Sequence, residues 1–458
     1  MIKLPVHSYQ HRSKRVGSER LVNCYAEQSP AEGKSPYSVT RCPGIVSPAS
    51  IVDPTAGEGR GLYRWQGILY SLVGTTLYKI NSSHVYTSIG TVAGLGLVSF
   101  AETPTQLVIC ANSASYYLVG STLTQITDAD FLSGVQVCGI DGFVLFRRES
   151  TGIFFGSDLA NAASYDALNF ATAEGLADNI VGIIADHRQV ILAGEASMEI
   201  FFNAGISGFP FIRDSNGFVE LGCAAGKTLA KIDNSVFWLA SDLTVRRLDG
   251  NTPVRVSQHG VEQLIATYTT SDAYAFTYTQ YGHLFYVLTF PTNMATWVLD
   301  ITTGEWHERE SYGLTRWRPI SSAHAYGKVY VQDYQTGKIG YLDIDTYTDW
   351  GDTQRMEFTF QDIYSTGRRM KHRRLEMICE TGVGTVSGQG VDPQFTLEYS
   401  DDSGKTWETL PTKSLGGVGE YKTQLEWWAL GQSRYRQYRA SISDPVKVVI
   451  ADAQLDAA

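Results

Sequence analysis

A short pattern that recurs through the middle of the chain limits its possible folds more than any other feature. In each copy a strand-like segment reaches a turn, and an aromatic or β-branched run follows it. The copies occupy residues 65–70, 103–108, 141–146, 187–192, 233–238, 281–286 and 326–331, and the copy at 103–108 is the weakest. Their turns are 37 to 48 residues apart, and repeats of this length that hold several short strands are typical of propeller blades. We therefore predict a β-propeller of about seven blades over residues 59–351.

The regions on either side of the repeat differ from it. Residues 1–58 contain six prolines and are predicted to form an extended N-terminal arm. One strand is expected at 20–27, which would either close the propeller as an outer strand or reach a neighbouring subunit. Short helical turns are expected only at 157–177 and 261–265. From residue 352 the strands and their links become longer, so we predict a C-terminal β-sandwich over 352–458 and an all-β fold class overall.

Composition excludes several classes of protein. The chain has 458 residues, a net charge of −10 and 12% aromatic residues. A protein that gripped nucleic acid through its overall charge would be basic. No apolar stretch is long enough to span a bilayer, and the polar run at 11–15 leaves the N-terminus without a signal-peptide core, so we expect synthesis and retention in a cytoplasm. The six cysteines lack any CxxC spacing and are not expected to form a disulfide framework.

Residues 400–407 resemble the Asp-box of sialidases and other propellers. The turn would be formed by Ser400, Asp402 and Gly404, with Trp407 packed beneath it. A glycosidase is one interpretation. In those enzymes, however, the box is a structural hairpin that recurs in several blades, whereas here it occurs once and outside the repeat. We therefore predict a structural turn.

Residues 368–374 concentrate positive charge in an acidic chain. The candidate partner-contact or DNA-contact residues are Arg368, Arg369, Lys371, Arg373 and Arg374. On a strand, alternation would place the side chains of 369, 371 and 373 on one face and those of 368, 372 and 374 on the other. A strand that is basic on both faces indicates solvent or an acidic partner surface more often than phosphate contact, because charge runs are commonly solvated.

No other constellation predicts chemistry. His7 and His11 have a His-x3-His spacing but lack a nearby acidic or Cys ligand. The run 222–228 resembles the end of a Walker A loop, but its spacing is one residue short and we interpret it as a turn between blades. There is no Gly-x-Ser-x-Gly nucleophile elbow. We expect no catalytic residues, no metal site and no cofactor.

Several phrases in the central region resemble one known family. They occupy residues 22–25, 42–45, 194–205, 209–211, 219–223, 236–239, 253–257, 283–291, 296–300 and 305–308. Their order over residues 20–320 is similar to that in the packaged-DNA stabilisation proteins, or tail accessory factors, of short-tailed bacteriophages, which form the tail nozzle or hub. The resemblance continues less specifically into the C-terminal domain, and the basic segment 368–374 is not part of a motif of that family.

The resemblance implies a structural virion protein of the tail, made in the host cytoplasm, with no catalytic residues. It implies a ring, with six copies expected, below the portal and adaptor proteins. Such a ring would extend the DNA channel, retain the packaged genome and anchor a tail needle, fibre or spike, while double-stranded DNA passes without sequence-specific binding. The alternatives are a propeller that binds or hydrolyses host-surface glycans and, more weakly, a scaffold propeller of a cellular protein.

Overall fold

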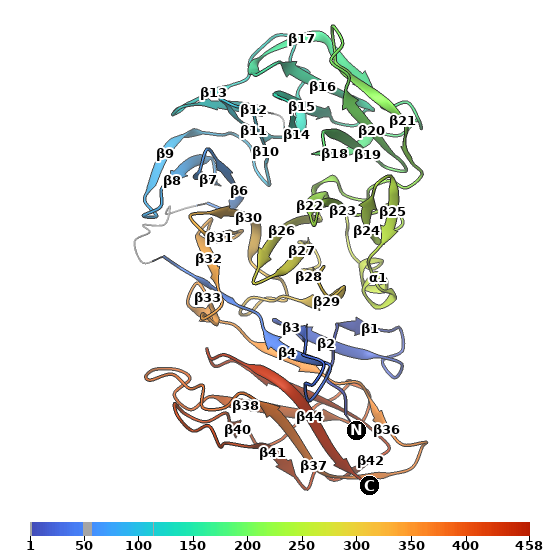
Figure 1. Ribbon diagram of the computed structural model, residues 1–458, viewed down its shortest axis with the longest axis vertical. Helices are drawn as coiled ribbons and strands as arrows, with labels where there is room; N and C mark the ends of the chain where they lie inside the picture. The colour runs from blue at the N-terminus through green and yellow to red at the C-terminus, as the bar shows by residue number, and fades with distance from the viewer. Residues whose placement is uncertain (1, 49–56, 113) are drawn as a thin grey trace.

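The computed structural model describes residues 2–48, 57–112 and 114–458. The chain is almost entirely β-structure and forms a propeller and a smaller sandwich at opposite ends of the long axis (Figure 1). In the described residues the helical elements are α1 (His259–Ile265) and the short 3-10 turn η1 (Gly226–Thr228). Both chain ends lie at the sandwich (Figure 1).

In the part of the chain that the structure describes, the propeller has seven blades of four strands each; five blades are separate sheets, and two are parts of larger sheets. The first blade consists of β6 (Gly59–Trp65), β7 (Ile68–Val73), β8 (Thr76–Ile80) and β9 (Tyr86–Thr91). The second consists of β10 (Ser99–Glu102), β11 (Leu107–Ala111), β12 (Ala114–Val119) and β13 (Thr122–Gln125). The third blade consists of β14 (Gly134–Ile140), β15 (Phe143–Arg148), β16 (Ile153–Asp158) and β17 (Asn161–Thr172). The fourth consists of β18 (Ile180–Asp186), β19 (Gln189–Gly194), β20 (Met198–Asn203) and β21 (Phe211–Val219). The fifth blade consists of β22 (Ala230–Ile232), β23 (Ser235–Leu239), β24 (Val245–Asp249) and β25 (Thr252–Arg255). The sixth consists of β26 (Tyr274–Gln280), β27 (His283–Phe290), β28 (Ala295–Asp300) and β29 (Glu305–Glu308). The seventh contains β30 (Pro319–Ala325), β31 (Lys328–Asp333), β32 (Ile339–Asp343) and β5 (Gly44–Val46).

The recurring turn of the sequence joins the first two strands of a blade. In six blades both central residues of this turn have positive φ, as in Asp233 at 53° and Asn234 at 54°. This is the type I′ geometry, whose twist matches that of the two strands it connects. In the second blade the turn is different, because the Thr103 hydroxyl accepts hydrogen bonds from the backbone N–H groups of Thr105 and Gln106. The second blade, whose copy of the sequence pattern is the weakest, therefore has a different type of turn from the other six.

Neighbouring blades bury their apolar faces against each other. Between the second and third blades, Val108 on β11 belongs to the same buried cluster as Phe146 on β15 and Phe155 on β16. The two phenylalanine rings stack with centroids 5.5 Å apart. Burying a side chain of this size contributes about 1.5–3 kcal/mol, so the stacking of blades is the main source of stability for each one.

A strand from the N-terminal region closes the propeller. The backbone of β5 pairs antiparallel with β32, with Ile45 opposite Leu342, and parallel with β33 (Thr348–Asp349), which is followed by β34 (Asp352–Thr353). The strand that closes the propeller is therefore β5. The run 20–27, for which closing the propeller was one of two expected roles, does not do so. Residues 49–56, which link β5 to the first blade, lie outside the described residues.

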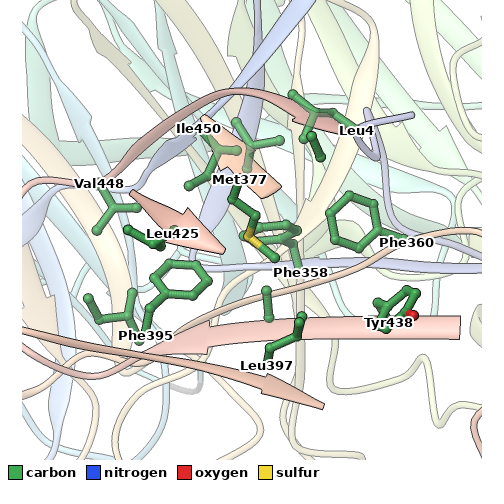
Figure 2. Packing of buried hydrophobic residues seen from close by; sticks show 14 of the residues in the cluster. Leu4, Phe358, Phe360, Met377, Phe395, Leu397, Leu425, Tyr438, Val448 and Ile450 are labelled. Carbon is green, nitrogen blue, oxygen red and sulfur yellow. The ribbon is translucent and has the colours of Figure 1, made fainter. Parts of the chain in front are cut away.

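The sandwich contains two sheets. One has the order β3 (Cys24–Gln28), β4 (Tyr37–Arg41), β44 (Val449–Ala457), β37 (Met370–Cys379), β41 (Leu425–Trp428), with β42 (Gln432–Ser433) beside β37. The other has the order β2 (Ser18–Val22), β35 (Met356–Thr359), β43 (Tyr435–Ile442), β38 (Gln394–Ser400), β39 (Glu408–Thr409), with β1 (Tyr9–Gln10), β36 (Ile363–Tyr364) and β40 (Lys413–Ser414) alongside. Figure 2 shows the apolar core between them, in which Phe358, Phe395 and Leu397 are fully buried.

The N-terminal segment joins the two units. The run 20–27 is divided into β2 and β3 at Asn23, whose φ is 53°. One edge of β2 pairs with β29 of the sixth blade and the other with β35 of the sandwich. The resulting 12-stranded sheet passes from propeller to sandwich without a break. Ile2 and Leu4 also pack in the sandwich core.

The expected helical turns have different outcomes. The turn expected at 261–265 is part of α1. At 157–177 the expectation was wrong, because this segment contains the 12-residue strand β17, which pairs with β16. Pairing with the neighbouring strand of the blade determines the structure of this segment.

Candidate partner-binding surface

The described residues contain no group of three His, Cys, Asp or Glu side chains placed to hold a metal ion. None of their helices is long and apolar enough to cross a membrane. The features that remain from the sequence are the basic segment and the Asp-box-like turn, and both lie in the sandwich.

The basic segment begins in a turn and continues into β37. Arg368 and Arg369 precede the strand, and Lys371 and Arg373 lie on it, with all four side chains exposed. The described residues offer them no ion pair. The strict alternation expected for a strand is broken, because His372 is opposite Ala457 while Arg374 is opposite Asp456, which leaves Arg373 as an extra residue in a β-bulge.

His372 and Arg374 belong to the basic segment but add no unpaired positive charge to its surface. His372 is buried, with Nε2 2.9 Å from the Ser433 hydroxyl and Nδ1 3.1 Å from that of Tyr438. Burial, reinforced by nearby Arg436, lowers the pKa of His372 to about 4, so the ring is neutral at pH 7. Arg374 donates a hydrogen bond of 2.9 Å to Glu426 and lies near Glu376.

The fold brings further cations to the same end of the sandwich. Arg15 lies over the ring of Tyr435, 5.3 Å from its centroid, and Tyr435 stacks with Tyr364 on β36, just before the basic segment. Arg434 follows Ser433, which pairs with Met370 at the start of β37. We call this surface the basic end; it consists of Lys14, Arg15, Arg368, Arg369, Lys371, Arg373 and Arg434, all exposed. Sequence reasoning missed the members outside 368–374, although the polar run at 11–15 was visible.

The Asp-box-like residues form a turn between β38 and β39. Asp402 accepts hydrogen bonds from the backbone N–H groups of Lys405 and Thr406, and Ser400 accepts one from that of Gly404. These bonds, with the Thr406 amide as the largest contribution, hold the pKa of Asp402 well below its usual range. Trp407 packs beside Gly404 and against the guanidinium of Arg439, 4.2 Å from the ring centroid. The side chains of Ser400 and Asp402 bond only within the turn, whereas Asp401 pairs with Arg436 and Ser403 donates to Asp362.

Family models match both units of the chain. Residues 9–347 match the model described as "Bacteriophage P22 Gp10, beta-propeller", and residues 355–458 match "Bacteriophage P22 Gp10, beta-sandwich". The chain belongs to the bacteriophage P22 Gp10 family. The resemblance inferred from the sequence is thus confirmed, as are the propeller and the sandwich. Members of the P22 Gp10 family are phage tail proteins, so this chain is a structural protein of the virion.

Solved structures of low sequence identity are similar to this P22 Gp10 family member. The extracellular domain of a putative hybrid two-component system, BT4673 from B. thetaiotaomicron, is 10% identical, with 89% of this chain and 59% of that chain covered and a TM-score of 0.46. The propeller domain of Cps50 (Swd1) from Myceliophteria thermophila is 9% identical, covering 63% and 97%, with a TM-score of 0.43. The computationally designed Ika8 protein is 13% identical, covering 66% and 100%, with a TM-score of 0.41. No match was found among curated protein sequences.

Proposed function

We propose that this protein forms a ring of six copies below the portal and adaptor of a short-tailed phage, where it extends the DNA channel, retains the packaged genome and anchors a needle, fibre or spike. The observation that carries the proposal is the match to the P22 Gp10 family over both the propeller and the sandwich. A closed ring requires two different surfaces on each subunit that meet head to tail. A two-domain unit connected by one continuous sheet can present such surfaces at a fixed relative orientation.

In this proposal the DNA passes through the central hole of the ring, which the copies surround, and not along the axis of any single propeller. The cavities lined by the inner strands have volumes of about 400 and 220 Å³. A duplex whose major groove alone is about 12 Å wide does not fit such spaces. The net charge of −10 suits a channel wall past which DNA slides, because each phosphate neutralised by a wall cation would add affinity.

The basic end has a different role in the same proposal. Cations on the channel wall would retard the duplex, so the proposal places the basic end against an acidic surface of a neighbouring copy or virion protein. Exposed Arg and Lys side chains that form no ion pair with a carboxylate of the described residues are suited to such a contact.

Removing charge from the basic end should therefore weaken assembly. Because each exposed ion pair contributes up to about 1 kcal/mol, changing Arg368, Arg369, Lys371 and Arg373 to Ser should reduce the affinity for tail-less heads by about 10- to 100-fold. The matched control changes four exposed cations elsewhere to Ser, namely Arg64, Arg148, Lys231 and Lys422. Co-sedimentation of the two variants with heads measures the difference. Equal binding by both would refute a partner contact at the basic end, and loss of DNA binding with intact assembly would point to phosphate contact.

The function itself is tested on DNA-filled heads that carry portal and adaptor but lack the rest of the tail. The purified chain should form a ring at the vertex, seen by electron microscopy, and should slow the appearance of nuclease-accessible DNA. The control is an equal amount of the chain added to heads without the adaptor, where the proposal expects no ring. If the chain neither binds nor retains DNA, the proposal is wrong and glycan binding becomes the next assay.

A further inference from the structure

A cavity lined by residues of several blades lies in the middle of the propeller, and the proposed tail function assigns it no role. Its volume is about 400 Å³, within the range of small-molecule sites. Its walls come from several blades, including Gly59 on β6, Arg147 on β15, Val181 on β18 and Tyr274 on β26. A second cavity of about 220 Å³ shares Lys227 and Tyr274 with it.

Three cations line this cavity, and none forms an ion pair with a carboxylate of the described residues. Arg147 donates to the side-chain oxygen of Gln136 and to the carbonyl of Ile180, both at 3.2 Å. Lys227, in η1, donates to the carbonyl of Leu97 at 3.3 Å. Both cations are therefore satisfied only by neutral acceptors, which leave their positive charge uncompensated.

Arg316 is the most deeply buried of the three cations. Its side chain is 94% buried, since the residue is only 6% exposed. Nη2 donates to the Tyr274 hydroxyl at 2.9 Å, and the guanidinium lies 3.7 Å from the centroid of the Tyr334 ring. Nε is buried and has no hydrogen-bond partner. Leaving a buried donor without an acceptor costs about 1–3 kcal/mol, so the guanidinium keeps a positive charge that the described residues do not compensate.

The electrostatics of the cavity also favour an anion. The pKa of Lys227 is lowered, first by burial and then by repulsion from Arg147 and Arg60. Glu58 and Asp272 are the carboxylates on the wall, against three cations. Asp272 uses Oδ2 to accept hydrogen bonds from the N–H and hydroxyl of Thr292, while Oδ1 is buried without a donor. The wall therefore carries one more cation than carboxylates.

We propose that this cavity is a binding site for a small oxyanion, a phosphate or a carboxylate, held by Arg147, Lys227 and Arg316. The guanidinium group matches the geometry of both kinds of oxyanion, and the lysine adds a point charge. The phosphate would come from the solution, and the carboxylate from an acidic side chain of a bound polypeptide. The site is independent of ring formation, because every residue in it belongs to a single propeller.

Isothermal titration calorimetry of the full chain with inorganic phosphate, and separately with succinate, tests the proposal at constant ionic strength. We expect binding by the unaltered chain and at least about tenfold weaker binding by Lys227→Gln and by Arg147→Gln, because each loses a charged hydrogen bond. Lys231→Gln, an exposed cation outside the cavity, is the matched control and should bind as the unaltered chain does. Circular dichroism confirms that each variant is folded.

Two outcomes overturn the proposal: no binding of either anion by the unaltered chain, or unchanged affinity in both cavity variants. Binding of phosphate alone supports the site and assigns it to phosphate. Binding of succinate with equal or higher affinity supports the site and assigns it to a carboxylate ligand. Neither result depends on whether heads bind the protein, so failure here is distinguishable from failure of the tail function.

Discussion

Changing Gly44 to Ala should prevent the propeller from closing and lower its stability by about 3 kcal/mol, near the upper end of what overpacking costs. Gly44 begins β5, and its N–H donates to the Thr346 carbonyl at 2.6 Å. A β-carbon at this position would collide with the carbonyl oxygen of Thr348 and lie 2.7 Å from the Thr348 nitrogen and 2.9 Å from the Thr346 oxygen. All three are backbone atoms and cannot rotate away, so β5 would have to leave the seventh blade.

The expected result is a lower urea midpoint, followed by tryptophan fluorescence, and faster proteolysis of the seventh blade. Gly17→Ala is the control, because the nearest atom to its added β-carbon is a Tyr9 ring carbon at 3.1 Å, and a side chain can shift. If Gly44→Ala has the same midpoint as the control, closure by β5 does not limit the stability of the propeller.

Changing Arg20 to Met should loosen the junction between the two units. Arg20 lies on β2 and reaches Glu308 of the propeller at 2.7 Å and Glu357 of the sandwich at 3.6 Å. Glu310 is also 2.7 Å away. Without the guanidinium, three carboxylates would face one another at a largely buried position. We expect a loss of about 2 kcal/mol, less than the 3–5 kcal/mol of a fully buried pair because the Arg20 side chain is 33% exposed.

The effect of Arg20→Met should increase with pH. Burial raises the pKa of Glu310, and Arg20 is the group that opposes this shift. In the variant the folded-state pKa of Glu310 should therefore rise further above its unfolded value. A carboxyl with a raised folded pKa favours the folded state at low pH, and that contribution is lost as pH rises.

Urea midpoints of Arg20→Met should therefore fall further below those of the unaltered chain at pH 8 than at pH 5. Arg64→Met removes an exposed arginine that has no ion pair in the described residues, and it serves as the control at both pH values. An Arg20→Met midpoint that matches this control at pH 8 would show that the carboxylates find other partners.

Features with a local cause could be predicted from the sequence. A type I′ turn requires positive φ at two residues, and pairs such as Asp141-Gly142 and Asp233-Asn234 meet that need. Each pair marks the first hairpin of a blade, so the spacing of the pairs predicted the propeller. The Asp-box-like turn was predictable for the same reason, since Asp402 bonds only to residues within four positions of itself.

Features that depend on distant pairing could not be predicted. The closing strand β5 has three residues and no periodicity of its own, and its partner β32 lies almost 300 residues away. The basic end combines segments that are far apart in the chain, and nothing in the sequence shows that the runs at 11–15 and 368–374 lie on the same surface. The axial cavity is assembled from single residues of several blades, with no motif to mark it.

The pairing of the first strands with the last affects how the protein can be made. Val39 on β4 pairs with Ile450 on β44, and Leu21 on β2 pairs with Phe358 on β35. While the ribosome is still translating the blades, the apolar faces of β2, β3 and β4 have no sandwich to enter. The emerging chain must keep this segment from premature association until the final strands are released, and slow assembly is typical of such long-range strand pairing. Co-expression with a chaperone should therefore raise the yield of soluble protein more than it would for a propeller alone.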